Sequence, residues 1–540
     1  MMLEGSPLEG PGPALSRLLD VGLGAKPGEP AMVSAERELS WREVDERTSA
    51  LAAAYLGLGL EPGDRVASLM PNRIDLAVHY LACFRVGLVA VPLNYRYTHR
   101  EIDHALGVCG ASALLAHAER GEDLAASSLV GELPLGVITY GGAAAPAPGA
   151  APAPAAPAAH NAPADRDLEA LIAAAGELPA VPAPEPTDPA AIFFTSGSTG
   201  PSKGVTHTHE SLRWMITSAG AALELTPEDT FLPGSSMSHL GSFLWSLAML
   251  GAGGRVVVAR TFDAHELLPL LREYRPTVLA MIPAALSALV HDHDLEPEDF
   301  SSLRVCRAGA DAVSTELLAD FSKLAGFPID EGYGMSEIGL ATLNPPSGVI
   351  KQGSIGQPVP GFSIRVLSED REHVSAGEVG QICMRSRSRM RGYWEAPGAT
   401  EEVLDDGWLD SGDLARYDED GYLHFFGRKK QVIVHDGSNI SPPEVESSLD
   451  EHPAVELAGV VGVHDEVHGE NVRAYVTLRE GAERPSSADL IVFSRERVGY
   501  KAPEEVIVLE EMPLNPTGKI DRTGLKRMAS EHLHPHLTPE

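Results

Sequence analysis

The N-terminal part of the chain alternates between helical and extended patterns of apolar residues. Segments 40–60 and 74–86 carry apolar side chains at helical spacing, whereas 63–69 and 89–93 have the pattern of short strands. Helices that alternate with strands are typical of an α/β architecture, in which helices cover the faces of sheets. We therefore predict an α/β fold with helix-covered sheets in the N-terminal part.

Segment 141–163 interrupts this pattern, because it consists almost entirely of Ala, Pro and Gly. A segment of that composition cannot bury much apolar surface. We predict that it forms an extended, mobile surface loop inserted into the large domain, and not a domain boundary.

The domain boundary is expected near Gly427-Arg428-Lys429-Lys430. The chain that follows has a suitable size for a small domain and contains two strand-like runs, 457–463 and 472–478. We predict a large N-terminal domain over residues 1–429 and a small C-terminal domain over 430–540.

The composition excludes several kinds of partner. The chain has 540 residues, too many for one ordinary core, and its 44% hydrophobic and 22% charged residues are typical of globular proteins. The formal net charge of −34 argues against nucleic acid or an anionic membrane as the main partner. A site for an anionic nucleotide must therefore gather its lysines and arginines locally.

The cysteines and the ends of the chain favour a cytoplasmic protein. The four cysteines include no C-x-x-C pair, so free thiols are expected in place of a disulfide framework or a zinc cluster. No secretory signal is evident at the N-terminus, and no apolar run approaches about 18 residues, the length that would span a membrane.

A loop rich in small residues follows an apolar, strand-like run at 192–194. It reads Thr-Ser-Gly-Ser-Thr-Gly-Pro-Ser-Lys-Gly from Thr195 to Gly204, and its spacing is not that of a Walker loop. Small side chains let backbone N–H groups approach a polyphosphate, and hydroxyls and a lysine add donors and charge. The loop therefore predicts a phosphate site, although a flexible surface turn has a similar composition.

This loop resembles the phosphate-binding signature of the adenylate-forming superfamily, which includes acyl-CoA synthetases, peptide-synthetase adenylation domains and luciferases. Four further motifs are similar to those of the family and follow in its order: Gly332-Tyr333-Gly334-Met335-Ser336-Glu337, Trp408-Leu409-Asp410-Ser411-Gly412-Asp413, Gly427-Arg428-Lys429-Lys430 with the segment to Glu446, and Asn515-Pro516-Thr517-Gly518-Lys519. The resemblance extends from about Leu39 to Arg522 and implies that the small domain is a mobile α+β lid.

The resemblance implies a role for each matching residue. The β- and γ-phosphates of ATP would be bound by Ser196, Ser198, Thr199, Gly200 and Lys203. Tyr333 would lie against adenine, Ser336 would contact the α-phosphate, and Glu337 would ligate magnesium. Asp413, assisted by Arg428, would accept from the ribose hydroxyls. Lys519 would bridge the substrate carboxylate and the ribose. Lys430 would be the hinge of the lid, and Gly437 would let the pantetheine arm of coenzyme A pass.

The acyl pocket is expected around His239, Gly241, Met281, Gly309 and Gly334. Amino-acid-activating relatives place an aspartate on this wall to pair with the α-ammonium group, because a buried cation needs a partner. No aspartate stands there, so we expect a fatty, aryl or alicyclic acid. His239 would contact the carboxylate or simply pack.

Four arginines, Arg385, Arg387, Arg389 and Arg391, alternate in this otherwise acidic chain. On a strand they would share one face. A solvated strand surface is the favoured interpretation, and attraction of the nucleotide phosphates of coenzyme A is the alternative.

These features predict an acid–CoA ligase that uses ATP, Mg²⁺ and coenzyme A. The acid would first form acyl-AMP and pyrophosphate, and coenzyme A would then displace AMP. Three alternatives remain open: a ligase that loads a carrier protein, one that stops at the adenylate, and a non-enzymatic nucleotide-binding regulator. The sequence does not identify the acid or the oligomeric state.

Overall fold

The computed structural model describes residues 2–141, 166–195, 202–291, 295–309, 313–436, 438–465, 467–515 and 519–533. The predicted insertion at 141–163 lies outside the described residues apart from Gly141. Also outside them are Ser196, Ser198, Thr199, Gly200 and Gly437.

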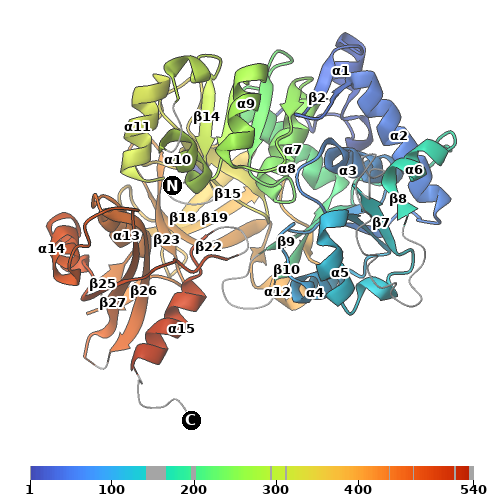
Figure 1. The fold of residues 1–540 in the computed structure, drawn as a ribbon. Coiled ribbons are helices and arrows are strands. Elements are labelled where there is room, and N and C mark those ends of the chain that lie inside the picture. The colour runs from blue at the N-terminus through green and yellow to red at the C-terminus, as the bar shows by residue number, and fades with distance from the viewer. Residues whose placement is uncertain are drawn as a thin grey trace.

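Two large sheets of mostly parallel strands form the main part of the molecule (Figure 1). The eight-stranded sheet contains β4 (Arg65–Leu69), β5 (Val89–Pro92), β6 (Ala113–His117), β7 (Val137–Tyr140), β8 (Arg166–Asp167), β9 (Pro189–Thr195), β10 (Lys203–Thr208) and β20 (Gly392–Tyr393), in the order β20-β10-β9-β5-β4-β6-β7-β8. The nine-stranded sheet contains β2 (Pro30–Val33), β3 (Glu38–Ser40), β11 (Thr230–Gly234), β12 (Arg255–Val257), β13 (Val278–Met281), β14 (Val305–Ala308), β15 (Asp330–Met335), β16 (Gly339–Leu343) and β17 (Gln357–Pro358), in the order β17-β16-β15-β14-β13-β11-β12-β2-β3.

Helices cover both faces of these sheets. They are α1 (Asp20–Ala25), α2 (Trp41–Gly57), α3 (Ile74–Val86), α4 (His99–Cys109), α5 (Gly121–Ala126), α6 (Leu168–Ala174), α7 (His209–Ala222), α8 (Leu240–Gly251), α9 (Ala264–Tyr274), α10 (Pro283–His291), α11 (Thr315–Ala325) and α12 (Pro397–Glu401). The predicted helices at 40–60 and 74–86 are confirmed as α2 and α3. A capping box between Ser40 and Glu43 fixes the start of α2.

The apolar cores show how the layers stack. Buried residues of α3 and α8 share one cluster with residues from both sheets, such as Val66 and Phe231, so these helices lie between the sheets. Ala67, the next residue on β4, faces a separate cluster with α4. On the far side of the other sheet, α9, α10 and α11 pack in a third cluster. Strands buried on both faces explain the continuous apolar runs in the sequence.

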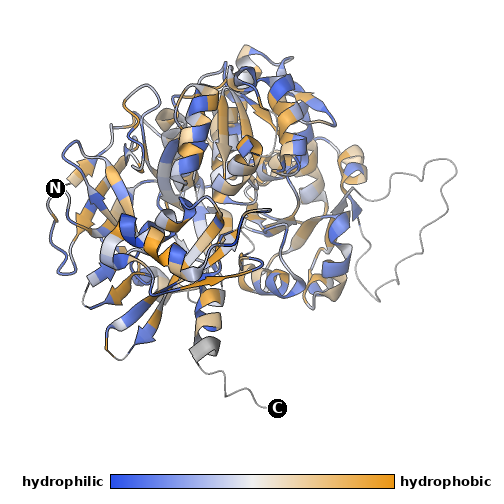
Figure 2. Ribbon diagram, turned by 60° about the vertical axis from the view of Figure 1, so that its left-hand side comes forward, coloured by the Kyte–Doolittle hydropathy of each residue, from blue (hydrophilic) through white to orange (hydrophobic). Residues whose placement is uncertain are grey.

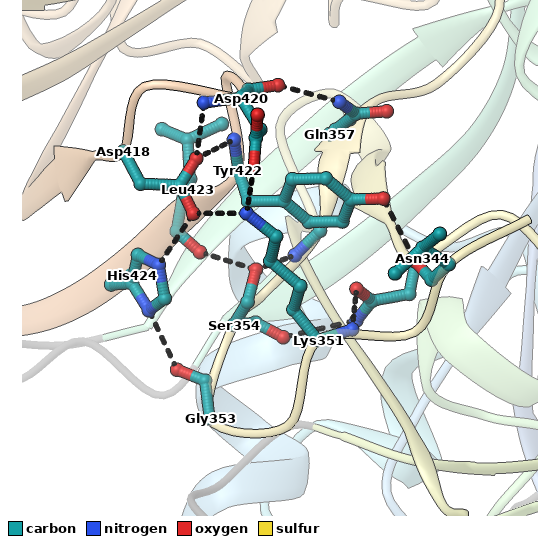
Figure 3. Close-up of polar contacts among 12 residues, drawn as sticks. Asn344, Lys351, Gly353, Ser354, Gln357, Asp418, Asp420, Tyr422, Leu423 and His424 are labelled. Carbon is teal, nitrogen blue, oxygen red and sulfur yellow. Dashed lines mark hydrogen bonds and ion pairs between the residues drawn. The ribbon is translucent and has the colours of Figure 1, made fainter.

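A third, antiparallel sheet adjoins these layers. It contains β1 (Met2–Glu4), β18 (Phe362–Leu367), β19 (Gly380–Ser386), β21 (Leu404–Asp405), β22 (Trp408–Tyr417) and β23 (Leu423–Arg428). The turn between β22 and β23 is tied to loop 344–356, because the Lys351 ammonium donates to Asp418 at 2.7 Å and to Asp420 at 2.6 Å (Figure 3). The Ser354 hydroxyl also donates to the carbonyl of Leu423. These contacts hold the two strands that carry Asp413 and Arg428.

The C-terminal residues form a separate five-stranded sheet with helices on both faces (Figure 1). Its elements are β24 (Ile433–His435), β25 (Ser438–Ile440), β26 (Val455–Asp465), β27 (Gly469–Leu478), β28 (Glu505–Val508), α13 (Pro442–Asp450), α14 (Ser487–Val498) and α15 (Arg522–Leu533). The strands predicted at 457–463 and 472–478 are confirmed as β26 and β27. Val445 and Leu490 pack on one face of the sheet and Leu525 on the other.

In Figure 2, apolar residues are concentrated on the strands and on the inner helices, and polar residues are concentrated toward the outside of the molecule. All four cysteines are buried free thiols, as predicted. Among the described helices, none has the length and apolar character needed to cross a membrane.

Candidate active site

The residues predicted for the acyl wall lie at the carboxyl ends of the parallel strands of the nine-stranded sheet. Gly234, Met281 and Ala308 stand side by side at the carboxyl ends of β11, β13 and β14. Ligands of open α/β sheets bind at this edge. His239 directly precedes α8, and Gly309 follows β14, so both belong to the same region.

The predicted adenine and ribose residues lie in direct contact, although 80 positions separate them in the chain. The Tyr333 hydroxyl donates to Asp413 Oδ2 at 2.7 Å, and the ring of Phe425 stacks beside that of Tyr333. Arg428, the cross-strand partner of Asp413, places Nε 3.4 Å from Asp413 Oδ1. Burial raises the pKa of Asp413, while Arg428, Tyr333 and Lys519 oppose that rise.

The predicted magnesium residue, Glu337, is buried beside Tyr393. The Tyr393 hydroxyl donates to Glu337 Oε1 at 2.9 Å, and Lys203 Nζ lies 4.9 Å from the centre of the Tyr393 ring. Desolvation raises the pKa of the Glu337 carboxyl, and the hydrogen bond from Tyr393 and the charge of Arg428 partly offset this. A cation beside Glu337 would favour its charged form.

The end of the phosphate loop is linked to the backbone of Ser336. Lys203 pairs with Thr195 across β9 and β10, so the two ends of the loop lie together. Further along β10, His207 Nε2 donates to the carbonyl of Ser336 at 2.7 Å. Gly334 permits a close turn here, because a Cβ would lie only 2.3 Å from the carbonyl oxygen of Gly339.

Lys519 approaches this site from the C-terminal domain. Burial is the main cause that lowers the pKa of His239 to about 4, and the positive charges of Lys519 and Arg96 add to it. The same Lys519 charge acts on Asp413. Its backbone is held by Asn515, whose side-chain oxygen accepts from Lys519 N–H at 3.1 Å. The charge of Lys519 therefore acts on both the predicted ribose residue and the predicted acyl-wall histidine.

The predicted hinge, Lys430, is exposed in the connection between the two domains. The carbonyl of Arg428 accepts from the N–H groups of Gln431 and Val432 and closes a turn around it. β23 ends at Arg428 in one sheet, and β24 begins at Ile433 in another.

The sequence patterns missed Tyr393, and they placed Arg307 on the pocket wall without giving it a role. Tyr393 contacts Glu337 and Lys203, and its Gly-Tyr-Trp context was the available signal. Arg307 is buried on the acyl wall, with its guanidinium 4.9 Å from the ring centre of Trp245, and burial lowers its pKa to about 10. Its Nη1 has no hydrogen-bond partner among the described residues. The wall thus contains a buried cation as well as apolar groups.

The expectation that the four alternating arginines share one strand face is wrong. β19 ends at Ser386, so only Arg385 lies on the strand. Arg385 packs against Trp408, with its guanidinium 4.9 Å from the ring, and Arg387 packs against Trp214 at 4.8 Å. The strand ends because the next residues turn toward the site, where Met390 N–H donates to the carbonyl of Glu337.

Comparison with protein families gives two matches. Residues 20–394 match the family described as AMP-binding enzyme, and residues 444–519 match the AMP-binding enzyme C-terminal domain.

Several proteins of similar length are similar in sequence to this chain over nearly its whole length. A feruloyl-CoA synthase of an Amycolatopsis species is 33% identical over 496 residues, covering 91% of this chain and 94% of that protein. A long-chain-fatty-acid–CoA ligase of Escherichia coli O157:H7 is 32% identical over 521 residues, covering 92% and 91%. A fatty acid–[acyl-carrier-protein] ligase, ScoC of Streptomyces coeruleorubidus, is 30% identical over 515 residues, covering 93% of each.

Solved structures of related enzymes are also similar to the structure of this chain. ATP-bound MatB from Rhodopseudomonas palustris superposes with a TM-score of 0.85 at 28% identity, covering 96% of this chain and 99% of that one. The o-succinylbenzoate CoA synthetase of Bacillus subtilis, in complex with its acyl-adenylate intermediate, has a TM-score of 0.81 at 26% identity, covering 94% and 98%.

Proposed function

Because this chain belongs to the AMP-binding enzyme family, we propose that it is an AMP-forming acid–CoA ligase. The observation that carries this proposal is the meeting of Lys203, Glu337, Asp413 and Lys519, which come from four distant parts of the chain, around one site. A feruloyl-CoA synthase and a long-chain-fatty-acid–CoA ligase among the relatives support the same chemistry.

In the first half-reaction, a carboxylate oxygen of the acid attacks the α-phosphorus of ATP. The bond from that phosphorus to the bridging oxygen breaks, and pyrophosphate leaves. Two anions approach each other in this step, so fixed positive charge stabilises its transition state. Lys519 is suited to supply that charge, because its field already reaches His239 and Asp413.

The nucleotide would be held by groups that the protein has already placed. Tyr333 and Phe425 offer an aromatic surface for adenine, and Asp413 can accept from the ribose hydroxyls with Arg428 beside it. Ser336 would contact the α-phosphate, and Lys203 the outer phosphates together with Ser196, Ser198, Thr199 and Gly200. Glu337 fits magnesium, since it is a buried carboxylate with one side-chain donor, Tyr393, among the described residues. Bound magnesium would neutralise charge on the triphosphate.

In the second half-reaction, the thiolate of coenzyme A attacks the acyl carbonyl, and the bond to the AMP oxygen breaks. We propose that residues 430–540 form a lid that turns about Lys430 between the two steps and brings Gly437 onto the thiol path. The separate sheets on either side of Lys430 support this division.

The acid is proposed to be a fatty, aryl or alicyclic carboxylic acid bounded by His239, Gly241, Met281, Gly309 and Gly334. Gly241 leaves space, because a Cβ there would meet no atom within 4 Å. The buried Arg307 adds one polar feature to this wall. We propose that the enzyme acts in the cytoplasm, which supplies ATP and coenzyme A and keeps its four buried thiols reduced.

A carrier protein is the alternative acyl acceptor, because ScoC, a relative of similar length, is a fatty acid–[acyl-carrier-protein] ligase. One panel assay separates the possibilities. Pyrophosphate release is measured with fatty, aryl and alicyclic acids, and thioester formation is measured with coenzyme A or with a phosphopantetheinylated carrier protein. Acid-dependent pyrophosphate release followed by acyl-CoA formation is expected. Acyl transfer to the carrier alone, or release of the adenylate alone, would overturn the CoA assignment.

A further inference from the structure

Two histidines and an aspartate meet on the C-terminal domain, and none of them is among the residues proposed to bind the nucleotide. They are His435 at the end of β24, Asp436 directly after it, and His468 directly before β27. One ligand atom from each lies within 4.8 Å of the others. The backbone fixes this meeting, because His435 pairs with Gly469 and Asp436 N–H donates to the carbonyl of His468 at 2.9 Å.

The hydrogen bonds of His435 determine which ring nitrogen is free. Its Nδ1 lies 2.7 Å from the carbonyl oxygen of Glu470 and must donate to it, since a carbonyl cannot donate. In the neutral ring, Nε2 therefore carries a lone pair. Nε2 faces two carboxylates, with Asp436 Oδ2 at 3.8 Å and Glu504 Oε1 at 3.6 Å. Three electron-rich atoms around one point favour a cation between them.

His468 completes the group from the other side. Its Nδ1 lies 2.9 Å from Asp436 Oδ1, and its ring stacks on that of His435 with centroids 5.1 Å apart. Glu504 is held in place, because its other oxygen accepts from Val472 N–H at 2.5 Å. Backbone contacts of this kind orient the ligands of metal sites.

These spacings suit a small divalent ion. Zinc binds histidine nitrogen and carboxylate oxygen at about 2.0–2.2 Å, so two ligand atoms of a tetrahedral site lie roughly 3.4 Å apart. The contacts of 3.6 and 3.8 Å lie close to that separation, and the ion would replace the 2.9 Å hydrogen bond that His468 Nδ1 donates to Asp436 Oδ1. Imidazole ligands favour zinc, copper or nickel over magnesium and calcium.

We propose that His435, Asp436 and His468 bind one divalent transition-metal ion of the zinc type, with the Glu504 carboxylate beside His435. Asp436 and the nearby Glu504 supply negative charge that favours a dication there. The ion links the end of β24 to the turn before β27. It therefore braces the edge of the C-terminal domain next to position 437.

The experiment uses the full-length protein, stripped of metal and kept free of ATP and magnesium. Zn²⁺ binding is measured by competition with a chromophoric chelator, and Co²⁺ is used as a spectroscopic probe of ligand geometry. The variants are His435→Gln, His468→Gln and Glu504→Gln. His464→Gln is the matched control, since His464 is an exposed histidine of the neighbouring strand β26.

One equivalent of Zn²⁺ is expected, together with a tetrahedral Co²⁺ spectrum and a zinc-dependent rise in Tm. Loss of either cluster histidine should weaken binding by about 100-fold or more, because disturbing a partner of a metal ligand already costs about 10–100-fold. The control should bind as the wild type does. Absent binding, or equal binding by wild type and the two cluster-histidine variants, would overturn the site. Because the readouts are binding and stability, the result is independent of the ligase activity.

Discussion

At Lys519, a single charge adds to the burial that lowers the pKa of His239 and opposes the burial that raises the pKa of Asp413. We therefore expect Lys519→Ala to abolish most acyl-AMP formation while leaving the fold and ATP binding intact. Loss of one preorganised electrostatic contact costs on the order of 10²–10³ in rate. Acid-dependent pyrophosphate release and Tm are the measurements, with Lys526→Ala on the exposed side of α15 as the control. Near-normal release by the Lys519 variant would refute its role.

Arg307 supports a second prediction at the scale of one residue. Its buried guanidinium packs on Trp245, and its Nη1 finds no acceptor in the described part of the chain. An acid with a hydrogen-bond acceptor at its far end could supply one, and a hydrogen bond to a charged group contributes about 1.5–3 kcal/mol. Arg307→Leu should therefore lower kcat/KM for such acids by roughly 10–100-fold relative to unsubstituted acids of the same length.

Paired acids measure this preference, for example an aryl acid with and without a distal carboxylate. Arg307→Lys, which keeps the charge, should retain part of the preference. An equal change for both members of each pair would show that Arg307 only stabilises the wall.

At the scale of elements, β10 brings a buried histidine against the Ser336 backbone. Burial lowers the pKa of His207 from 6.5 to about 4, and its hydrogen bond to the Ser336 carbonyl opposes this only in part. Between these values the unfolded chain binds a proton that the folded chain does not. His207 therefore makes stability fall as the pH drops from about 6.5 to 4, by up to about 1.4 kcal/mol per pH unit.

His207→Gln should flatten this part of the pH dependence, although the variant can start from a lower Tm. The measurement is Tm between pH 7 and 4.5, and the exposed His373→Gln is the control. A parallel decline in wild type and His207→Gln would contradict the assignment.

Helices and strands with a clear apolar pattern within one segment could be predicted from the sequence. Features that depend on contacts between residues far apart in the chain could not. Helix α3 follows from its apolar periodicity and β26 from its valine-rich run, because each pattern lies within one segment. The end of β19 at Ser386 depends on a contact between Met390 and Glu337, which no local pattern encodes. Tyr393 was missed for the same reason, since its importance comes from two residues far away in the chain.

At the scale of the whole molecule, the two domains are joined by side chains as well as by the chain itself. The Ser441 hydroxyl donates to the carbonyl of Phe426, and Arg479 forms an ion pair with Glu316 on α11. The charge of Lys519 acts on both Asp413 and His239, which is the arrangement we propose for the first half-reaction. The proposed rotation of the lid requires Lys519 to withdraw before the second half-reaction and another part of the lid to take its place.

That requirement gives the last prediction, which concerns Lys430. Proline at this position would restrict φ and the conformation of the preceding residue, and so oppose rotation of the lid. The Lys430 N–H donates to no acceptor in the described part of the chain, so Lys430→Pro should keep acyl-AMP formation and lose most of the thioester step. Gly437→Leu should have the same effect by obstructing the thiol path.

The two half-reactions are measured apart, with acid and ATP for the first and purified acyl-AMP with coenzyme A for the second. Lys430→Ala is the control, since it removes the side chain and leaves the backbone free to rotate. It should support both steps, because the hinge role belongs to the backbone and the Lys430 side chain is exposed. Equal loss of both steps in Lys430→Pro would mean damage to the fold, and full thioester formation would mean that the lid turns about another residue.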